Sequence, residues 1–435
     1  MLRRSKKQSR SRLRIQRLTD ASKICARLWR GLSISREGGV SPCCTYVGKV
    51  TTLTNDDGQD LLSSAPFTEL REKSLQGKSI AGCRKCYQKE TAGGRSMRMI
   101  YNDAFALETH TQPADTLIDA SSDVRLRSLT ITVGNLCNLQ CRMCNPFSSS
   151  RIAADPIHSG WFGHRSDRDE SKDIESAYAE IIESCSSITH LQISGGEPLI
   201  IPKIHKILQS LIDSGRAQNV VLMMPTNCTG VGDPVLARLS KFKEVHLRMS
   251  LDGHGPANEY IRYPSKWSEI VDTIIRFKGL PHAKLSIGFT LSALNVFEVV
   301  RTAQFGDAMG IPFTFGVVHT PSRLSPNILP QATLEQAAVE IDDAVDSLTL
   351  NPSKRELRAI SRLLRSFARQ DREENEELWT KFVQFTNDLD RSRGQSIEAS
   401  LPDLVTSLRV EKGPWQRNIF HILPKDRATP VSKAS

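Results

Sequence analysis

The sequence predicts an α/β protein built on a partial (β/α)6 TIM-type barrel, with an N-terminal cysteine-rich module and a C-terminal helical extension. Short runs of apolar and β-branched residues alternate with helical stretches in the middle of the chain. The segment before them carries five of the ten cysteines, and the region after them has helical periodicity. A chain of 435 residues is long enough to bury a substantial core.

Six strands are expected in the barrel. They lie near 129–134, 190–194, 219–224, 245–250, 284–291 and 312–318. Parallel strands covered by helices read as short apolar runs, as these do. Six β/α units leave the barrel open on one side, which would admit a large substrate. In α/β barrels the active site lies at the carboxyl ends of the strands.

The remaining chain is divided as follows. Residues 331–411 form a helical extension with two apolar stripes, one at Leu357, Ile360, Leu364 and Phe367 and one at Leu378, Phe382, Phe385 and Leu389. The other expected segments are a basic, disordered arm at 1–24, a cysteine-rich module at 25–120, the barrel at 121–330 and a loose tail at 412–435.

The most informative feature is the octapeptide at 137–144, in which Cys137, Cys141 and Cys144 have the spacing C-x3-C-x2-C. It follows the first expected barrel strand. Three thiolates are one fewer than a closed cubane iron–sulfur cluster needs, so one iron would keep an open coordination site. A structural zinc site usually pairs two C-x2-C elements, and no fourth ligand lies close by in the sequence.

A second motif, Gly195-Gly196-Glu197-Pro198, ends the next expected strand. Glycines let a backbone approach a ligand closely, and the glutamate can accept a hydrogen bond from an ammonium group. Alone this is an ordinary turn. Its position one strand and one helix after the three cysteines makes it informative.

Over residues 125–325 the chain resembles the radical S-adenosylmethionine (SAM) enzymes, with their motifs in family order. The resemblance implies that Cys137, Cys141 and Cys144 hold a [4Fe–4S] cluster whose fourth iron is chelated by SAM. It implies that Glu197 and the backbone at 195–196 contact the SAM amino group. Ser250 and Arg262 are candidates for the SAM carboxylate. The further cofactor-binding candidates are Pro198, Asn227 and Asp252, with Thr290, Ser292 and Asn295 near the ribose. Cys228 stands where the family often has glycine, and we interpret it as a packed thiol.

A second cysteine set lies upstream, with Cys25 and Cys43 spaced around Gly38 and a C-x2-C pair at Cys83 and Cys86. Residues 32–35 and 39–42 are expected to form a hairpin that returns Cys43 toward Cys25. This pattern resembles the SPASM/twitch auxiliary-cluster module, here placed before the barrel as in N-terminal-twitch radical SAM proteins. The resemblance implies a second [4Fe–4S] cluster on these four thiolates, with Cys44 as an alternative to Cys43. A structural zinc on the same sulfurs is the competing interpretation.

Charge and hydropathy narrow the environment. The net charge is +10, and residues 1–18 supply +8 of it without any acid. This arm could touch nucleic acid, but no aromatic-interleaved basic stripe supports nucleic-acid binding elsewhere. No stretch is apolar enough to span a bilayer, and no signal peptide is recognised. Free thiolates and oxygen-sensitive clusters favour a reducing, cytoplasmic location.

The resemblance implies an enzyme that cleaves SAM reductively to a 5′-deoxyadenosyl radical, which abstracts hydrogen from substrate. An electron donor such as flavodoxin or ferredoxin would be needed. Oxidative modification of a peptide or protein ranks first, and oxidation of a sugar or other small metabolite second. A non-enzymatic iron–sulfur electron carrier is the alternative from another class.

Overall fold

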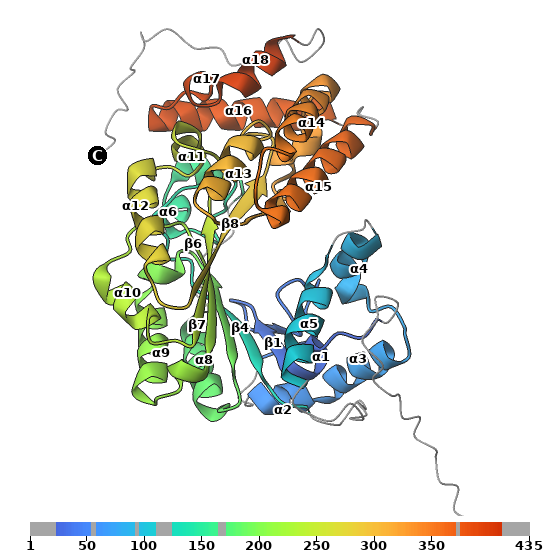
Figure 1. Cartoon of the computed structure of the whole chain (residues 1–435), viewed down its shortest axis with the longest axis vertical. Coiled ribbons are helices and arrows are strands. Elements are labelled where there is room, and N and C mark those ends of the chain that lie inside the picture. Colours follow the sequence, from blue (N-terminus) through green and yellow to red (C-terminus); the bar gives the residue numbers. More distant parts are fainter. Residues whose placement is uncertain are drawn as a thin grey trace, which may run out of the picture.

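The computed structural model describes residues 23–53, 58–91, 95–109, 124–163, 171–370 and 375–410. The expected arm at 1–24, except its last two residues, and the tail from 412 lie outside the described residues. The centre of the fold is one nine-stranded sheet in the order β3-β2-β1-β4-β5-β6-β7-β8-β9 (Figure 1). No described helix is long and apolar enough to cross a membrane.

Six parallel strands form the barrel portion and confirm the six expected from sequence. Each pairs in parallel with the next along the chain. They are β4 (Ser128–Val133), β5 (His190–Gly195), β6 (Val221–Thr226), β7 (Glu244–Ser250), β8 (Ala283–Leu291) and β9 (Phe313–Val317). The prediction was least accurate for β6, which begins two residues later than expected.

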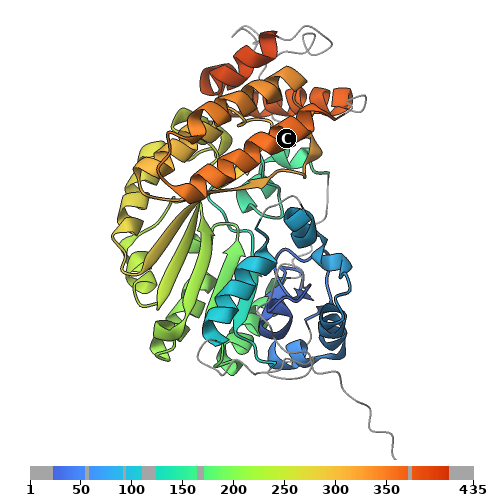
Figure 2. The same cartoon turned by 45° about the vertical axis from the view of Figure 1, so that its right-hand side comes forward.

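Helices cover the outer face of this curved sheet (Figure 2). They are α8 (Ser171–Ser184), α9 (Pro202–Asp213), α10 (Asp233–Leu239), α11 (Pro256–Ile261), α12 (Trp267–Lys278) and α13 (Val299–Ala308), with short turns η2 (Pro198–Ile200) and η3 (Ala217–Asn219). Alternate side chains of β4, among them Leu129 and Ile131, are fully buried in the main core. The intervening positions of β4 are polar, Thr130 and Thr132. The strand therefore alternates in polarity, because its inner face is not packed against helices.

The cysteine-rich module continues the barrel sheet, which no sequence pattern predicted. Strand β1 (Gly31–Ile34) pairs in parallel with β4, while β2 (Gly39–Ser41) and β3 (Thr51–Thr52) add antiparallel strands at the edge. The predicted β1–β2 hairpin is confirmed, and Gly38 takes a left-handed φ of 73° in its turn. Leu32 and Ile34 join the main core, which explains why the hairpin packs on β4. The module's helices are α1 (Arg27–Arg30), α2 (Gly58–Ser63), α3 (Ala65–Leu75), η1 (Ala81–Cys83), α4 (Arg84–Thr91) and α5 (Met97–Thr109).

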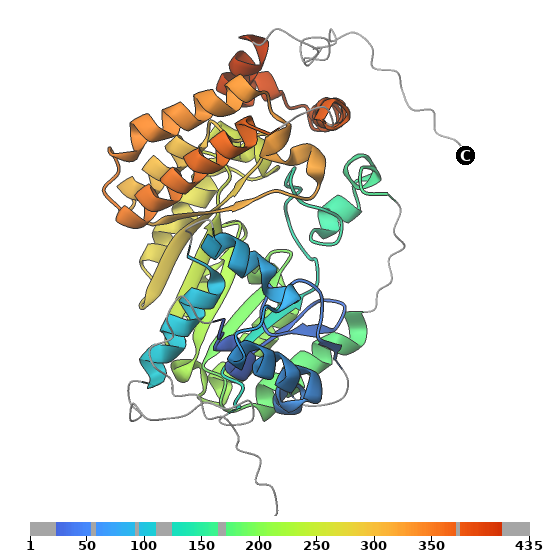
Figure 3. The same cartoon turned by 90° about the vertical axis from the view of Figure 1, so that its right-hand side faces the viewer.

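The C-terminal region is helical, as predicted. Its elements are η4 (Ser322–Leu324), η5 (Pro326–Ile328), α14 (Gln331–Val345), α15 (Asn351–Ala368), α16 (Asn375–Arg393), α17 (Ile397–Ser400) and α18 (Pro402–Val410). Leu364 of the first predicted stripe and Phe385 of the second are fully buried. Two short helices that follow the 137–144 loop, α6 (Ser150–Ala153) and α7 (Pro156–Gly160), lie in the region of α16, and α7 contacts it (Figure 3).

Candidate active site and cofactor sites

The three cysteines at 137–144 lie in the loop between β4 and α6, at the carboxyl end of β4. Backbone hydrogen bonds tie this cluster loop to the end of α11. The amide of Gln140 donates to the carbonyl of Tyr263 at 2.7 Å, and the amide of Arg142 donates to the carbonyl of Ile261 at 2.8 Å. The loop conformation is therefore held by the barrel rather than by a bound group.

The three thiols share one electrostatic environment. Burial raises the pKa of Cys141 to about 12 and that of Cys144 to about 11, and in each case neighbouring thiols of the set add to the increase. Burial also raises the pKa of Cys137. All three are free thiols. This donor set fits a [4Fe–4S] cluster, whose binding would displace the protons that burial retains.

Arg142 anchors the cluster loop to the C-terminal extension, a contact that no sequence pattern indicated. Its side chain is fully buried and lies 3.7 Å above the Tyr260 ring. Its Nη2 donates to Asp390 Oδ1 at 2.5 Å and to Gln395 Oε1 at 3.0 Å. A residue inside the three-cysteine motif is thus fixed by a helix 248 positions later in the chain.

The glycine pair at 195–196 packs directly on the cluster loop. A Cβ added at Gly196 would lie 2.2 Å from the Leu136 carbonyl oxygen, and the amide of Glu197 donates to that same oxygen at 2.9 Å. Glycine is required here because backbone meets backbone. The close approach predicted from the motif is confirmed, but its partner in the structure is the loop itself.

Glu197 is buried where β5 and β6 end. Its carboxylate accepts hydrogen bonds from the amides of Leu199 at 3.2 Å and Asn227 at 2.6 Å. Burial raises the pKa of Glu197 to about 7, against the lowering effect of those two bonds. Pro198 follows it in η2. A contact of Glu197 with the SAM ammonium stays a prediction.

Asn227 braces the cluster loop from the β6 side. Its Nδ2 donates to Asn138 Oδ1 at 2.9 Å, and Asn138 Nδ2 donates to Thr229 Oγ1 at 2.7 Å. Cys228, between Asn227 and Thr229, is buried with a left-handed φ of 62°. That conformation explains why glycine suits the position, and the burial confirms the packed thiol predicted for it.

Asp252 and Arg262 form a buried pair that reaches the cluster loop. Arg262 Nε lies 2.6 Å from Asp252 Oδ2, and Arg262 Nη1 lies 3.6 Å from Cys141 Sγ. Burial alone would lower the pKa of Arg262, but the Asp252 carboxylate outweighs it and the net shift is upward. The guanidinium therefore stays charged beside the thiols.

The remaining candidates lie at the carboxyl ends of β7 and β8. Ser250 ends β7, and the amide of Thr290 in β8 donates to Asp252 Oδ1 at 2.7 Å. Asn295 Nδ2 donates to the carbonyls of Asp252 and Thr290, each at 3.0 Å, and its Oδ1 accepts from the amide of Ser292 at 2.7 Å. These bonds join the two strand ends. The predicted placement of these residues near a ribose is not tested by them.

The module gathers its own set of thiols. Burial raises the pKa of the Cys25 thiol above its usual range, and the other three thiols of the predicted set raise it further. Burial raises the pKa of Cys83 to about 12. Thr45 Oγ1 lies 3.3 Å from Cys43 Sγ and 3.9 Å from Cys86 Sγ, which places these two thiols around one hydroxyl. The structure thus brings together the four cysteines expected to hold the auxiliary group.

Two residues of α5 hold the chain on both sides of Cys25. Asn102 accepts from the amide of Ala26 at 2.8 Å and donates to the carbonyl of Ile24 at 2.9 Å. Arg98 donates to that carbonyl at 3.0 Å and forms an ion pair with Glu90 at 2.7 Å. Arg27 links this segment to the barrel by donating to Thr130 Oγ1 at 2.9 Å.

No three histidine, cysteine, aspartate or glutamate side chains within the described ranges converge on a point that suits a single metal ion. A [4Fe–4S] cubane gives each thiolate its own iron, so its ligands stand farther apart than those of one zinc ion.

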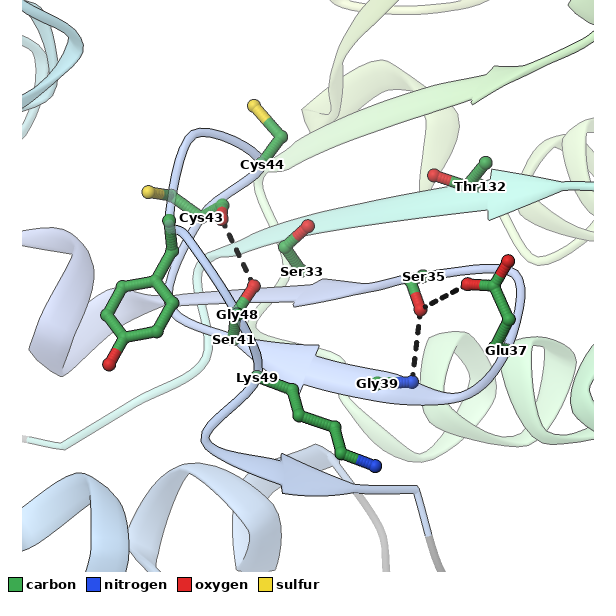
Figure 4. A pocket seen from close by; sticks show the side chains of 11 residues that line it. Ser33, Ser35, Glu37, Gly39, Ser41, Cys43, Cys44, Gly48, Lys49 and Thr132 are labelled. Carbon is green, nitrogen blue, oxygen red and sulfur yellow. Dashed lines mark hydrogen bonds between the residues drawn. The ribbon is translucent and has the colours of Figure 1, made fainter. Parts of the chain in front are cut away.

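A polar pocket of about 430 Å³ lies along the hairpin beside these thiols (Figure 4). Its lining includes Ser33, Ser35 and Ser41 of the hairpin region, Thr132 of β4, and both Cys43 and Cys44. Ser33 is level with Thr130 in the sheet. The pocket therefore extends from the module cysteines along β4 toward the end that carries the cluster loop. Cys44 is the more exposed of the two neighbouring thiols.

Arg248 of β7 lies on the inner face of the barrel and was missed by the sequence reasoning. It packs over Gly288 of β8, where a Cβ would lie 2.4 Å from its Nε. Enclosure lowers the pKa of Arg248, while Asp252 and, more weakly, Cys44 oppose that shift. A single arginine in an alternating strand gives no sequence signal of such a position.

Comparison with known families agrees with this geometry. The model of the radical SAM superfamily matches residues 131–295, and the model of the SPASM iron–sulfur cluster-binding domain matches residues 25–87. The chain is a radical SAM protein with a SPASM-type module. The cofactors of these domains are a [4Fe–4S] cluster with SAM and an auxiliary cluster.

Solved structures show more distant likeness. Native anSMEcpe with bound AdoMet is 18% identical with a TM-score of 0.38, over 51% of this chain and 62% of that one. The chain spans half the length of a polyhistidine-tagged anSMEcpe with bound AdoMet at 19% identity, over 45% of this chain, with a TM-score of 0.35. Streptococcus suis SuiB bound to S-adenosylmethionine is 13% identical, over 73% of this chain and 69% of that one, with a TM-score of 0.37. No curated protein matches the chain.

Proposed function

We propose that this protein is an oxidoreductase that uses SAM to modify a peptide or protein oxidatively within the polar space between its two cysteine sets. The observation that carries the proposal is the register of the sheet. Ser41, two residues before Cys43, is level with Ser33 and hence with Thr130 of β4, whereas Cys137 lies beyond the carboxyl end of β4. The pocket fills the interval between them.

In this proposal each cysteine set holds one cluster. Cys137, Cys141 and Cys144 would hold the cluster that binds SAM, and Cys25, Cys43, Cys83 and Cys86 the auxiliary one. When bound, these groups supply hydrogen-atom abstraction from an unactivated carbon and removal of the electron left on the substrate. A reductant of the flavodoxin or ferredoxin class would deliver electrons.

The chain's own residues position and shield the reactants. Arg262 keeps a positive charge beside Cys141, which suits an anionic partner such as the SAM carboxylate. Glu197 and Asn227 hold the loop against β5 and β6, so that the cluster loop cannot shift away from the barrel. The hydroxyls of the pocket offer hydrogen bonds to backbone amides, and Arg248 offers a charge to an acidic group of the substrate. This lining supports a polar substrate such as a peptide.

The test uses deuterium transfer. Reconstituted protein would be incubated anaerobically with SAM, dithionite and either the peptide or the small-metabolite fraction of deuterium-labelled cells. The proposal predicts 5′-deoxyadenosine that carries deuterium only with the peptide fraction. Deuterium from the small-metabolite fraction alone would favour oxidation of a sugar or other metabolite. Deuterium from neither fraction, while 5′-deoxyadenosine still forms, would contradict both.

A further inference from the structure

Arg323 is buried without an acidic partner among the described residues. It lies in η4, just after the last barrel strand, and is 9% exposed. Its Nη1 donates to the Trp161 carbonyl at 3.4 Å, whereas Nε and Nη2 have no hydrogen-bond partner. The guanidinium stacks over Phe385 at 4.6 Å and Phe162 at 5.0 Å. A buried charge without a counter-ion is costly, so the fold retains it at the expense of stability.

Two further arginines gather around the same point. Arg393 Nη2 lies 3.0 Å from His158 Nδ1, and since arginine only donates, His158 accepts at Nδ1. Burial lowers the pKa of His158 to about 3, and Arg393, Arg142 and Arg323 lower it further in that order. His158 is therefore neutral, and all three guanidinium groups lie within electrostatic range of its ring.

This arginine cluster, Arg142, Arg323 and Arg393, has unused donors and an excess of charge. Five of its buried nitrogens have no hydrogen-bond partner: Arg142 Nη1, Arg323 Nε and Nη2, and Arg393 Nε and Nη1. Two carboxylates face it, Asp390 at 2.5 Å from Arg142 and Asp155 at 3.8 Å from Arg393. Three positive charges against these two negative ones leave a surplus of one positive charge among the described residues.

We propose that the arginine cluster binds one small oxyanion, a carboxylate or a phosphate, between α7, η4 and α16. Guanidinium forks match the paired oxygens of both groups, and one such anion would neutralise the surplus charge and accept from the unpartnered nitrogens. None of the residues proposed for SAM belongs to this cluster. Because Arg142 lies inside the three-cysteine motif, a bound oxyanion would also fix the cluster loop against α16.

The experiment measures thermal unfolding and calorimetric binding of the reconstituted full chain. Inorganic phosphate and acetate are titrated separately, with sodium chloride keeping the ionic strength constant. We expect one site per chain and a saturable rise in Tm of roughly 3 °C at one hundred times Kd. A response to phosphate alone supports a phosphate site, and a response to acetate alone supports a carboxylate site.

Three variants separate binding from packing. Arg323→Met should weaken anion affinity at least about tenfold, because a charged donor pair is lost, without lowering Tm in chloride. Arg393→Gln should weaken it independently. The control Arg276→Met removes a half-exposed arginine paired with Asp233 and should leave the anion response unchanged.

Three results would overturn the proposal. One is the absence of a saturable response to both anions in the wild-type chain. Another is an anion response that Arg323→Met and Arg393→Gln both keep. The third is an equal loss of Tm in chloride and in phosphate for Arg323→Met, which would make the arginine a packing residue.

Discussion

The buried pair between Arg142 and Asp390 should control the stability of the cluster loop. The perturbation is Asp390→Ala, which leaves the Arg142 guanidinium without its carboxylate. Arg142 is 0% exposed and Asp390 14% exposed at the side chain, so solvent cannot replace the lost charge.

The magnitude follows from that burial. Removing one partner of a buried ion pair costs about 3–5 kcal/mol. Gln395 stays as a second acceptor for Arg142 Nη2, at 3.0 Å, which places the expected loss near the lower end, about 3 kcal/mol. Asp390 Oδ2 also accepts from the amide of Ile397 at 2.8 Å, and losing that bond adds about 1 kcal/mol.

The assay is urea unfolding of the full chain, with iron content measured on the same preparations. The matched control is Asp403→Ala. Asp403 also links the C-terminal helices to the barrel through an arginine, Arg301, but that pair is 50% and 44% exposed. An exposed pair contributes about 0.5 kcal/mol, so the control should change little.

Equal, small losses for the two variants would refute the reasoning, because the buried pair would then contribute no more than the exposed one. Loss of unfolding free energy with fully retained iron would show that the pair stabilises α16 but not the cluster loop.

Three other variants test the sites. Cys43→Ala should lose the auxiliary cluster, about four irons per chain, whereas Cys44→Ala should keep it, and iron analysis distinguishes them; equal loss in both would contradict the assignment. Asn102→Leu should also reduce iron by about four, since it removes two hydrogen bonds that flank Cys25, and an unchanged electron paramagnetic resonance spectrum of the reduced protein would argue against that role. Gly196→Ala should abolish SAM binding, measured by calorimetry, because its Cβ would lie 2.2 Å from a backbone oxygen. Gly160→Ala, with nothing within 4 Å of its Cβ, is the matched control and should bind SAM normally; normal binding by both would show that the turn tolerates a side chain.

Local patterns predicted much of the fold. The six barrel strands and the hairpin around Gly38 were predictable because apolar runs and turn glycines act over a few residues. The pairing of β1 with β4 was not, since any exposed strand edge can accept a parallel partner and nothing in 31–34 specifies which one.

The candidate site shows the same division. Spacing identified the thiols, because a cluster needs cysteines within reach of one another. The contacts that hold them were not predictable, since Arg142 and Asp390 are 248 positions apart and an arginine between two cysteines reads as an ordinary surface residue. The arginine cluster escaped for the same reason, because its members come from three separate segments of the chain.

The central claim is that the two cysteine sets hold two [4Fe–4S] clusters on one sheet. The most direct measurement is iron, acid-labile sulfide and zinc per chain after anaerobic reconstitution. The account predicts about eight irons and eight sulfides without zinc. About four of each together with one zinc would contradict the auxiliary cluster, and little or no iron would contradict the whole assignment.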